Sequence, residues 1–216
     1  LAGVNGVEVG QTVVISASVI ANDIISIVKR EAIQNHYFSL YLNIPFFALA
    51  IVLLRWNWYP ARVFVGDTFC YFAGMTFAVA GILGHFSKTM LLFFVPQMLN
   101  FLYSLPQLAK IVPCPRHRLP KLDPESGKLR PSVVSIRKDD RKSLKFIRML
   151  AFFRLVNVIH EDEEQVSINN MTLLNALLVI FGPMREDRLA ILLMVTQGLF
   201  NCLGLYIRHK LSTYLF

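Results

Sequence analysis

Four long stretches without Asp, Glu, Lys or Arg decide what kind of fold this chain can adopt. They hold 20, 21, 19 and 18 residues, at Thr68–Ser87, Thr89–Ala109, Leu189–Ile207 and Tyr37–Leu54. A helix that crosses a bilayer needs about 20 mostly apolar residues, because each residue advances it by about 1.5 Å through roughly 30 Å of hydrocarbon. Each stretch is therefore predicted to span a membrane.

The composition agrees with an integral membrane protein. Of the 216 residues, 55% are hydrophobic and 17% are charged, with a mean hydropathy of +0.50. Soluble domains carry roughly 25% charged residues, and disordered chains are also polar, so both classes are disfavoured. The net charge of +8 does not indicate nucleic acid, because 12 of the 22 Lys and Arg lie between Cys114 and Ile168 and most others flank apolar stretches. We expect the bilayer, and no nucleic acid, as a partner.

Two weaker apolar stretches complete the helix prediction. Val9–Asn22 has 14 uncharged residues and reaches Val28 only by including Asp23, yet we predict a first span there. Met171–Met184 also has 14, which favours a buried or interfacial helix. The predicted fold is an all-α, polytopic membrane bundle with five spans, at about 9–28, 37–54, 66–87, 89–109 and 189–207.

The distribution of positive charge orients this bundle. Five spans place 17 Lys and Arg on the side of the segment Lys110–Arg188, and 5 on the opposite side. The positive-inside rule makes the first side cytosolic. The short turn with Arg55 and Arg62 lies on this side as well, beside aromatic residues that are typical of a membrane interface.

The segment 114–168 is the one sizeable polar region, and we expect a cytosolic loop there. Its prolines and Gly127 predict turns and a mostly irregular backbone with a short β-hairpin. Ser143–His160 mixes Phe with Lys and Arg, which suggests an interfacial helix, and Asp139–Asp140 is interpreted as a solvated charge run. Shortly after this loop, Asn170 begins a match to a glycosylation acceptor; we expect it to be unmodified because the predicted topology places it in the cytosol.

Three short clusters lie at the predicted cytosolic ends of the spans: Gly3–Gly6, Val63–Asp67 and Pro113–Arg118. Within the second, Asp67 directly precedes an uncharged span, where a carboxylate is costly unless it is paired, hydrated or bound to a cation. Spacing alone favours a helix N-terminal Asp, stabilised by the helix dipole and by the nearby Thr68. The functional alternative is a ligand of Mg²⁺, which takes carboxylate and phosphate oxygens.

The other two clusters also allow two interpretations. The guanidinium groups of Arg116 and Arg118, with the imidazole of His117 between them, could bind phosphate oxygens. A basic patch that contacts lipid headgroups would have the same composition. The flanking prolines favour a site, because they fix the backbone direction. Asn5, between Gly3 and Gly6, is either a turn residue or an amide that approaches a ligand closely.

Three segments carry a family resemblance: Leu1–Gln11, Asn57–Phe94 and Pro96–Leu122. They resemble the eukaryotic UDP-N-acetylglucosamine–dolichyl-phosphate N-acetylglucosaminephosphotransferases, which are grouped with the bacterial polyprenyl-phosphate hexose-1-phosphate transferases. The resemblance implies ten spans, of which this chain would supply the last five. It also implies an active site on the cytosolic face of the endoplasmic reticulum membrane and sensitivity to tunicamycin.

The resemblance further implies roles for individual residues. Asp67 would be a catalytic residue and a Mg²⁺ ligand, and Phe64 would pack against the uracil that Gly3 and Asn5 contact. Arg116, His117 and Arg118 would hold the pyrophosphate and the N-acetylglucosamine, with His117 in a catalytic role.

The implied reaction is transfer of GlcNAc-1-phosphate from UDP-GlcNAc to dolichyl phosphate, with UMP as the leaving group. The family also uses an Asp-Asp pair and an Asn that precede Leu1, so the isolated chain is expected to be inactive. A homodimer is compatible with the resemblance, but the sequence does not determine the oligomeric state.

Two other classes of function remain open. A transporter would use the proline-broken fourth span and Asp67, but it predicts further ionisable residues inside the spans, and the sequence shows essentially none. A non-catalytic scaffold subunit would need neither Asp67 nor Asn5.

Overall fold

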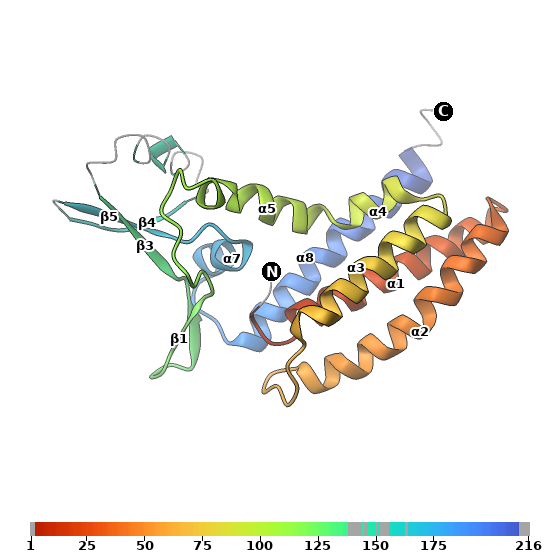
Figure 1. Cartoon of the computed structure of the whole chain (residues 1–216), viewed down its shortest axis with the longest axis horizontal. Helices are drawn as coiled ribbons and strands as arrows, with labels where there is room; N and C mark the ends of the chain where they lie inside the picture. The colour runs from red at the N-terminus through yellow and green to blue at the C-terminus, as the bar shows by residue number, and fades with distance from the viewer. Residues whose placement is uncertain are drawn as a thin grey trace. The chain divides into compact units, whose positions relative to one another are not determined.

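The computed structural model describes residues 3–137, 144, 147–149, 151, 156–162 and 164–211 (Figure 1). The chain divides into two compact units, which we describe separately: a loop unit made of residues 97–189, and a helical unit made of the residues on either side. The expected charge run Asp139–Asp140, and most of the expected interfacial helix in Ser143–His160, lie outside the described residues.

The helical unit consists of apolar helices. They are α1 (Val7–Val28), α2 (Ile33–Asn57), α3 (Gly66–Leu83), the short α4 (Ser87–Phe93) and α8 (Glu186–Tyr206), which continues into a π-helical turn (Ile207–Leu211). Within the described residues, four of these helices are long and apolar enough to cross a membrane: α1, α2, α3 and α8 with its π-helical turn. Helix α2 packs against both α1 and α3, and more extensively against α1 (Figure 1). The predicted class, a polytopic helical membrane protein, is confirmed.

The predicted fourth span is divided into two helices. α4 ends at Phe93, and α5 (Val95–Leu108) begins after a break at Phe94. Pro96 lies in the first turn of α5 and has no N–H to donate to the end of α4, so one continuous helix is disfavoured. The described residues therefore contain five candidate spans only if this bent pair counts as one.

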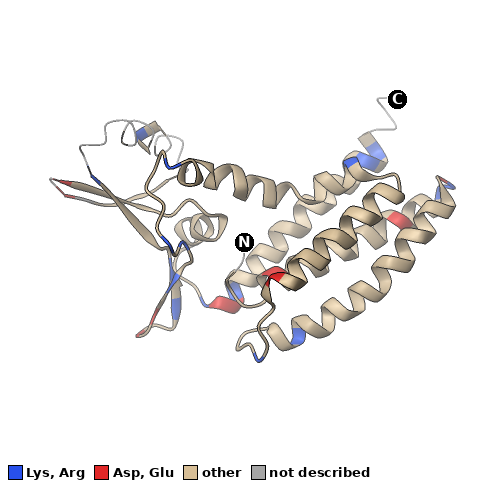
Figure 2. Cartoon of the chain, in the orientation of Figure 1, with Lys and Arg blue, Asp and Glu red and all other residues tan. Residues whose placement is uncertain are grey.

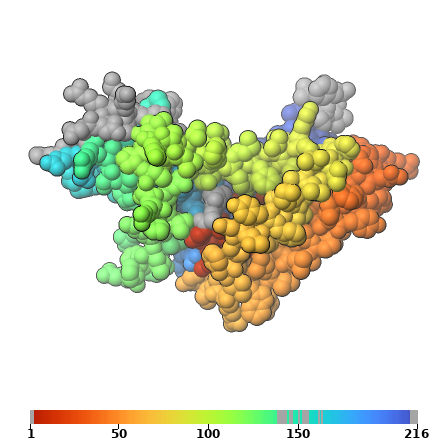
Figure 3. Space-filling model, in the orientation of Figure 1, coloured from red at the N-terminus to blue at the C-terminus, as the bar shows by residue number. Residues whose placement is uncertain are grey.

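Aromatic side chains fill the core of the helical unit. Phe46 and Phe77 pack edge to face with ring centroids 5.5 Å apart, and Phe77 packs likewise on Phe94 at 5.9 Å. Large apolar side chains also cover the outside, including Tyr41 and Tyr71. Figure 3 shows the atoms of α2 (orange) and α3 (gold) in one continuous surface, and Figure 2 shows that charged residues gather near the helix ends. An uncharged, apolar exterior is what contact with lipid requires.

Two glycines let α8 approach its neighbours closely. A Cβ atom on Gly10 of α1 would lie 2.7 Å from the Sδ atom of Met194, and one on Gly204 of α8 would lie 3.2 Å from the Cβ atom of Leu92. Such close approach of helices through small residues is common in membrane bundles.

A buried Asp–His pair joins α1 to α2. Nδ1 of His36 lies 2.7 Å from Oδ1 of Asp23, both side chains are at most 1% exposed, and the imidazole stacks on Phe86. Asn22, next to Asp23, lies 3.2 Å from Nε2 of His209. Asp23 lies in α1, as the predicted first span included it, but His36 lies in the first turn of α2 rather than in the preceding loop, so α2 holds a buried ionisable residue that the predicted span did not include.

The loop unit is more ordered than the sequence predicted. The expected hairpin is present as β1 (Lys121–Asp123) and β2 (Lys128–Arg130). In addition, β3 (Val133–Arg137), β5 (Gln165–Asn169) and β4 (Val158–Glu161) form an antiparallel sheet in the order β3-β5-β4. The expectation of a mostly irregular backbone is corrected here, because Val134, Ile136 and Val166 alternate with polar residues and turn toward one core.

A short helix packs against β5 and β2 in the loop unit. α7 (Leu173–Phe181) matches the expected short helix in Met171–Met184 and buries Leu174, Leu177 and Leu178. The hairpin end carries a polar cluster, in which the Ser126 hydroxyl donates to Asp123 at 2.6 Å. This bond, together with Arg130, lowers the pKa of the Asp123 carboxyl.

The buried pair in the helical unit leads to a stability prediction. His36→Leu leaves the buried Asp23 carboxyl without its imidazole partner, which should lower the free energy of unfolding by about 1–3 kcal/mol. Replacing both members by leucine should recover most of that loss, because no buried polar group is then left without its partner. The measurement is chemical denaturation in detergent of the complete reading frame that encodes this chain.

His85→Asn is the matched control, since His85 is exposed and its φ of 58° suits asparagine. It should change stability by less than about 0.5 kcal/mol. A His36→Leu protein as stable as wild type would show that the pair does not hold α1 to α2.

Candidate functional site

A glycine turn begins α1 and forms the first part of the candidate site. Gly3 and Gly6 have φ values of 101° and 80°, a region that favours glycine. The Gly3 N–H donates to Oε1 of Glu8 at 3.3 Å, so it is engaged within the turn. Asn5 lies between them and is half-buried.

The buried Asn57 amide joins this turn to the connection between α2 and α3. Its Oδ1 accepts from the Gly6 N–H at 2.9 Å, and its Nδ2 donates to the Val63 carbonyl, also at 2.9 Å. One side chain thus fixes two of the predicted clusters relative to each other. The sequence analysis did not identify Asn57, although the position of this residue directly before Trp58–Pro60 was a signal that could have indicated it.

The second cluster presents an aromatic ring and a carboxylate at the start of α3. Phe64 is 88% exposed, a high value for so large an apolar side chain, and Gly66 turns the chain into the helix at a φ of 67°. Asp67 follows in the first turn of α3 and is exposed. The N-cap residue, Val65, makes no side-chain cap, so Asp67 acts on the helix through the dipole rather than as a cap.

The carboxylates of Asp67 and Glu8 lie near enough for their charges to repel. Within the described residues, the Asp67 carboxylate accepts no hydrogen bond and forms no ion pair. Among the residues that the structure describes, no three His, Cys, Asp or Glu side chains lie close enough together to hold a metal ion. The donors present therefore fit a hard cation that takes one or two carboxylates and completes its shell with phosphate oxygens and water, as Mg²⁺ does.

The third cluster belongs to the loop unit. Arg116 and His117 are exposed, whereas Arg118 is half-buried. The Arg118 carbonyl accepts two hydrogen bonds, from Nδ2 of Asn175 at 2.8 Å and from Oγ of Ser132 at 3.1 Å. These side chains fix the backbone of the cluster, a function that sequence analysis assigned only to the flanking prolines.

A network of buried amides holds in place the two side chains that bond to the Arg118 carbonyl. Nδ2 of Asn170 donates to Oγ of Ser132, and Oδ1 of Asn170 accepts from Nε2 of Gln107 in α5, both at 2.9 Å. Oδ1 of Asn175 accepts from the Ser132 N–H at 2.8 Å. Because Asn170 is fully buried, a glycan could attach to its amide only by breaking this network.

The structure therefore brings together two of the three predicted clusters. The helical unit contains Gly3, Asn5, Phe64 and Asp67, on the two segments that the Asn57 side chain joins. Arg116, His117 and Arg118 lie in the loop unit and are placed by its own contacts.

Sequence comparison identifies relatives along the whole chain. The profile of the family described as glycosyl transferase family 4 matches residues 1–85, which include the first two clusters. The UDP-N-acetylglucosamine–dolichyl-phosphate N-acetylglucosaminephosphotransferase of Saccharomyces cerevisiae is 48% identical over all of this chain and 49% of its own length. Proteins of the same name from Schizosaccharomyces pombe and Dictyostelium discoideum are 45% and 44% identical over 97% of this chain.

The chain is therefore similar in sequence to these transferases over its whole length, and its residues 1–85 match the family 4 profile. The resemblance expected from the sequence is confirmed, and the chain spans about half the length of the curated relatives it matches. The family 4 profile ends before the Arg116–Arg118 cluster, which lies in the part aligned with the named transferases.

The hydrogen bond from Asn175 to the Arg118 carbonyl leads to a prediction about how readily a protease cleaves the chain after Arg118. In the complete protein, Asn175→Ala should raise the rate of tryptic cleavage after Arg118 by about five- to a hundredfold, because losing a hydrogen bond to a buried group costs about 1–3 kcal/mol. Mass spectrometry of the fragments measures the rate at this one bond.

Asn169→Ala is the control, since Asn169 is equally buried in the loop unit and bonds to Asn157 and Tyr103 instead of Arg118. It should leave cleavage after Arg118 within about twofold of wild type. Equal acceleration in both variants would mean that Asn175 supports the loop unit generally and not this cluster.

Proposed function

We propose that the complete protein transfers GlcNAc-1-phosphate from UDP-GlcNAc to dolichyl phosphate, giving GlcNAc-PP-dolichol and UMP. The observation that carries this proposal is the 48% identity, over the entire chain, to a transferase named for these two substrates. The product would be the first lipid-linked intermediate of protein N-glycosylation, which places the enzyme in the endoplasmic reticulum membrane with its active site facing the cytosol.

The glycine turn and Phe64 form the nucleotide end of the proposed site. Gly3 is exposed, has a positive φ and carries no side chain, so a base can approach its backbone closely, whereas Gly6 is buried against Trp58. Asn5 contributes an amide that both donates and accepts, as a uracil requires. The exposed ring of Phe64 supplies an apolar face for the base.

Asp67 is the proposed holder of Mg²⁺, with the Glu8 carboxylate near enough for the two charges to repel. When bound, Mg²⁺ neutralises charge on the pyrophosphate of the donor substrate and orients it. An exposed carboxylate without a partner among the described residues supports this role for Asp67. A helix-dipole role alone would leave that carboxylate available as well, so a variant must distinguish the two.

The Arg116–His117–Arg118 cluster is proposed to hold the pyrophosphate and the sugar. Two guanidinium groups can bind phosphate oxygens bidentately and stabilise the charge that spreads over them during transfer. An oxygen of dolichyl phosphate attacks the sugar-bearing phosphorus, a P–O bond forms, and the bond to the UMP oxygen breaks. Nη1 of Arg118 is buried without an acceptor among the described residues, which supports a ligand oxygen as its partner.

Removing the charge of Asp67 tests the metal role. In the complete reading frame expressed in membranes, Asp67→Asn should lower Mg²⁺-dependent transfer of labelled GlcNAc-1-phosphate at least a hundredfold, while the protein still accumulates. The measured quantities are labelled lipid product and released UMP.

Glu186→Gln is the control, because Glu186 also lies in the first turn of an apolar helix. A lost dipole interaction costs about 0.3–1 kcal/mol of stability and should leave transfer nearly unchanged. If Asp67→Asn behaves like Glu186→Gln, Asp67 only stabilises its helix. Transfer absent from the wild type would favour the scaffold alternative.

Removing the ring of Phe64 tests the nucleotide end. Phe64→Ala should raise the KM for UDP-GlcNAc by about tenfold with a smaller change in kcat, because stacking of a base on an aromatic ring is worth about 1–3 kcal/mol. Tyr71→Ala is the control, since Tyr71 is a similarly exposed aromatic residue on the same segment of chain and is 74% exposed. An unchanged KM in Phe64→Ala would remove Phe64 from the proposed site.

A further inference from the structure

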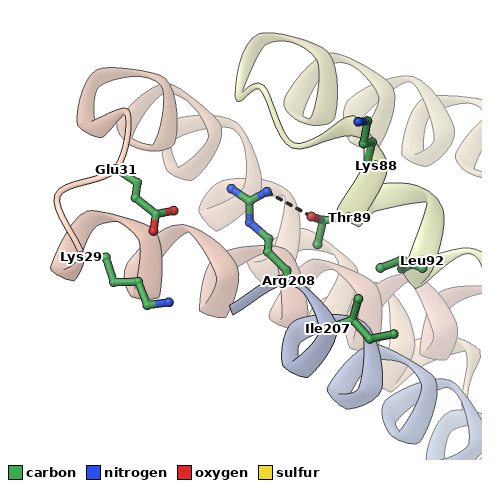
Figure 4. A pocket seen from close by; sticks show the side chains of 7 residues that line it. All are labelled: Lys29, Glu31, Lys88, Thr89, Leu92, Ile207 and Arg208. Carbon is green, nitrogen blue, oxygen red and sulfur yellow. Dashed lines mark hydrogen bonds between the residues drawn. The ribbon is translucent and has the colours of Figure 1, made fainter. Parts of the chain in front are cut away.

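A basic cavity lies at the end of the helical unit opposite the start of α3. It measures about 320 Å³ and is lined by residues of three separate chain segments (Figure 4). Lys29 and Glu31 come from the turn after α1, Lys88 from the start of α4, and Arg208 from the π-helical turn after α8. Three cations and one carboxylate therefore converge, which leaves the cavity with an excess of positive charge.

This convergence runs against the general charge distribution of the chain. The predicted non-cytosolic side carries 5 Lys and Arg, and three of these line this single cavity. Like charges that approach one another repel, most strongly near a membrane boundary where the dielectric constant is low. The Glu31 carboxylate offsets one of the three charges, and a bound anion would offset the other two.

Helix dipoles explain only part of the arrangement. Lys29 and Arg208 follow the C-terminal ends of α1 and α8, where a cation is favourable. Lys88 instead lies in the first turn of α4, where the dipole disfavours a cation. The presence of Lys88 in the lining of the same cavity as the other two cations therefore needs another reason.

Hydrogen bonds hold two of the three cations in position. Nη1 of Arg208 donates to Oγ1 of the buried Thr89 at 3.3 Å, as Figure 4 shows, and Nζ of Lys29 donates to the His209 carbonyl at 3.0 Å. Leu92 and Ile207 give the same cavity an aliphatic wall. Fixed cations beside an aliphatic wall suit a ligand with a phosphate group and an apolar remainder.

We propose that this cavity binds the phosphate group of an anionic membrane lipid. Arg208 and Lys88 would contact the phosphate oxygens, since guanidinium and ammonium groups form charge-assisted hydrogen bonds with them. Leu92 and Ile207 would contact the start of the acyl chains. The site is separate from the proposed transferase site and does not depend on it.

The test uses the complete reading frame, purified in detergent and depleted of lipid, with native mass spectrometry as the readout. The probes are dioleoyl phosphatidic acid, dioleoyl phosphatidylcholine with the same acyl chains and no net charge, and inorganic phosphate. Wild type should retain one phosphatidic acid per chain at concentrations where phosphatidylcholine does not bind. Lys88→Gln should weaken this binding about tenfold, and Lys88→Gln with Arg208→Gln further still.

Lys210→Gln is the matched control, because Lys210 is an exposed cation of the same π-helical turn that does not line the cavity. It should bind phosphatidic acid within about twofold of wild type. Equal weakening by Lys210→Gln, or unchanged binding in Lys88→Gln, would overturn the site. Inorganic phosphate that binds as tightly as phosphatidic acid would keep the anion site and overturn the assignment to a lipid.

Discussion

The buried side chain of Asn57 is the interaction on which the helical part of the candidate site depends. Its oxygen accepts from Gly6 at the start of α1, and its nitrogen donates to Val63 before α3. The glycine turn is far from Phe64 and Asp67 in the sequence, and this amide fixes the two segments relative to each other. A buried amide without hydrogen-bond partners would lower the stability of the fold. The two hydrogen bonds of Asn57 therefore satisfy its buried polar atoms as well as joining the two segments.

The membrane helices could be predicted from the sequence because the physics behind them is simple. Long uncharged stretches locate α2, α3 and α8, and their ends were misjudged where polar residues find buried partners. The prediction for α2 starts at Tyr37, for example, whereas the helix starts at Ile33, because His36 pairs with Asp23 inside the unit. The strands were harder to foresee, since β3 pairs with β5 about 30 residues further along the chain, and strands of three to five residues carry little periodicity.

The candidate site could be predicted as a set of residues but not as an arrangement. Cluster position and family resemblance indicated Asp67, Phe64 and the Arg116–Arg118 cluster. Neither indicated Asn57 or Asn175, because a supporting amide has no distinctive sequence pattern and is recognised only by the carbonyl or N–H that it reaches. In both units the supporting residues are buried asparagines, which can donate and accept at once and so join two backbone segments with one side chain.

The two glycine contacts of α8 have unequal consequences for how the sequence can drift over time. At position 10, the methyl group of an alanine would contact the flexible end of Met194, which can rotate away, so alanine can replace this glycine. At position 204, it would meet the Cβ atom of Leu92 and the ring of Phe93, which have no such freedom. Natural variants of this protein should therefore be permissive at the first glycine and restricted at the second, even though both look alike as small residues in apolar helices.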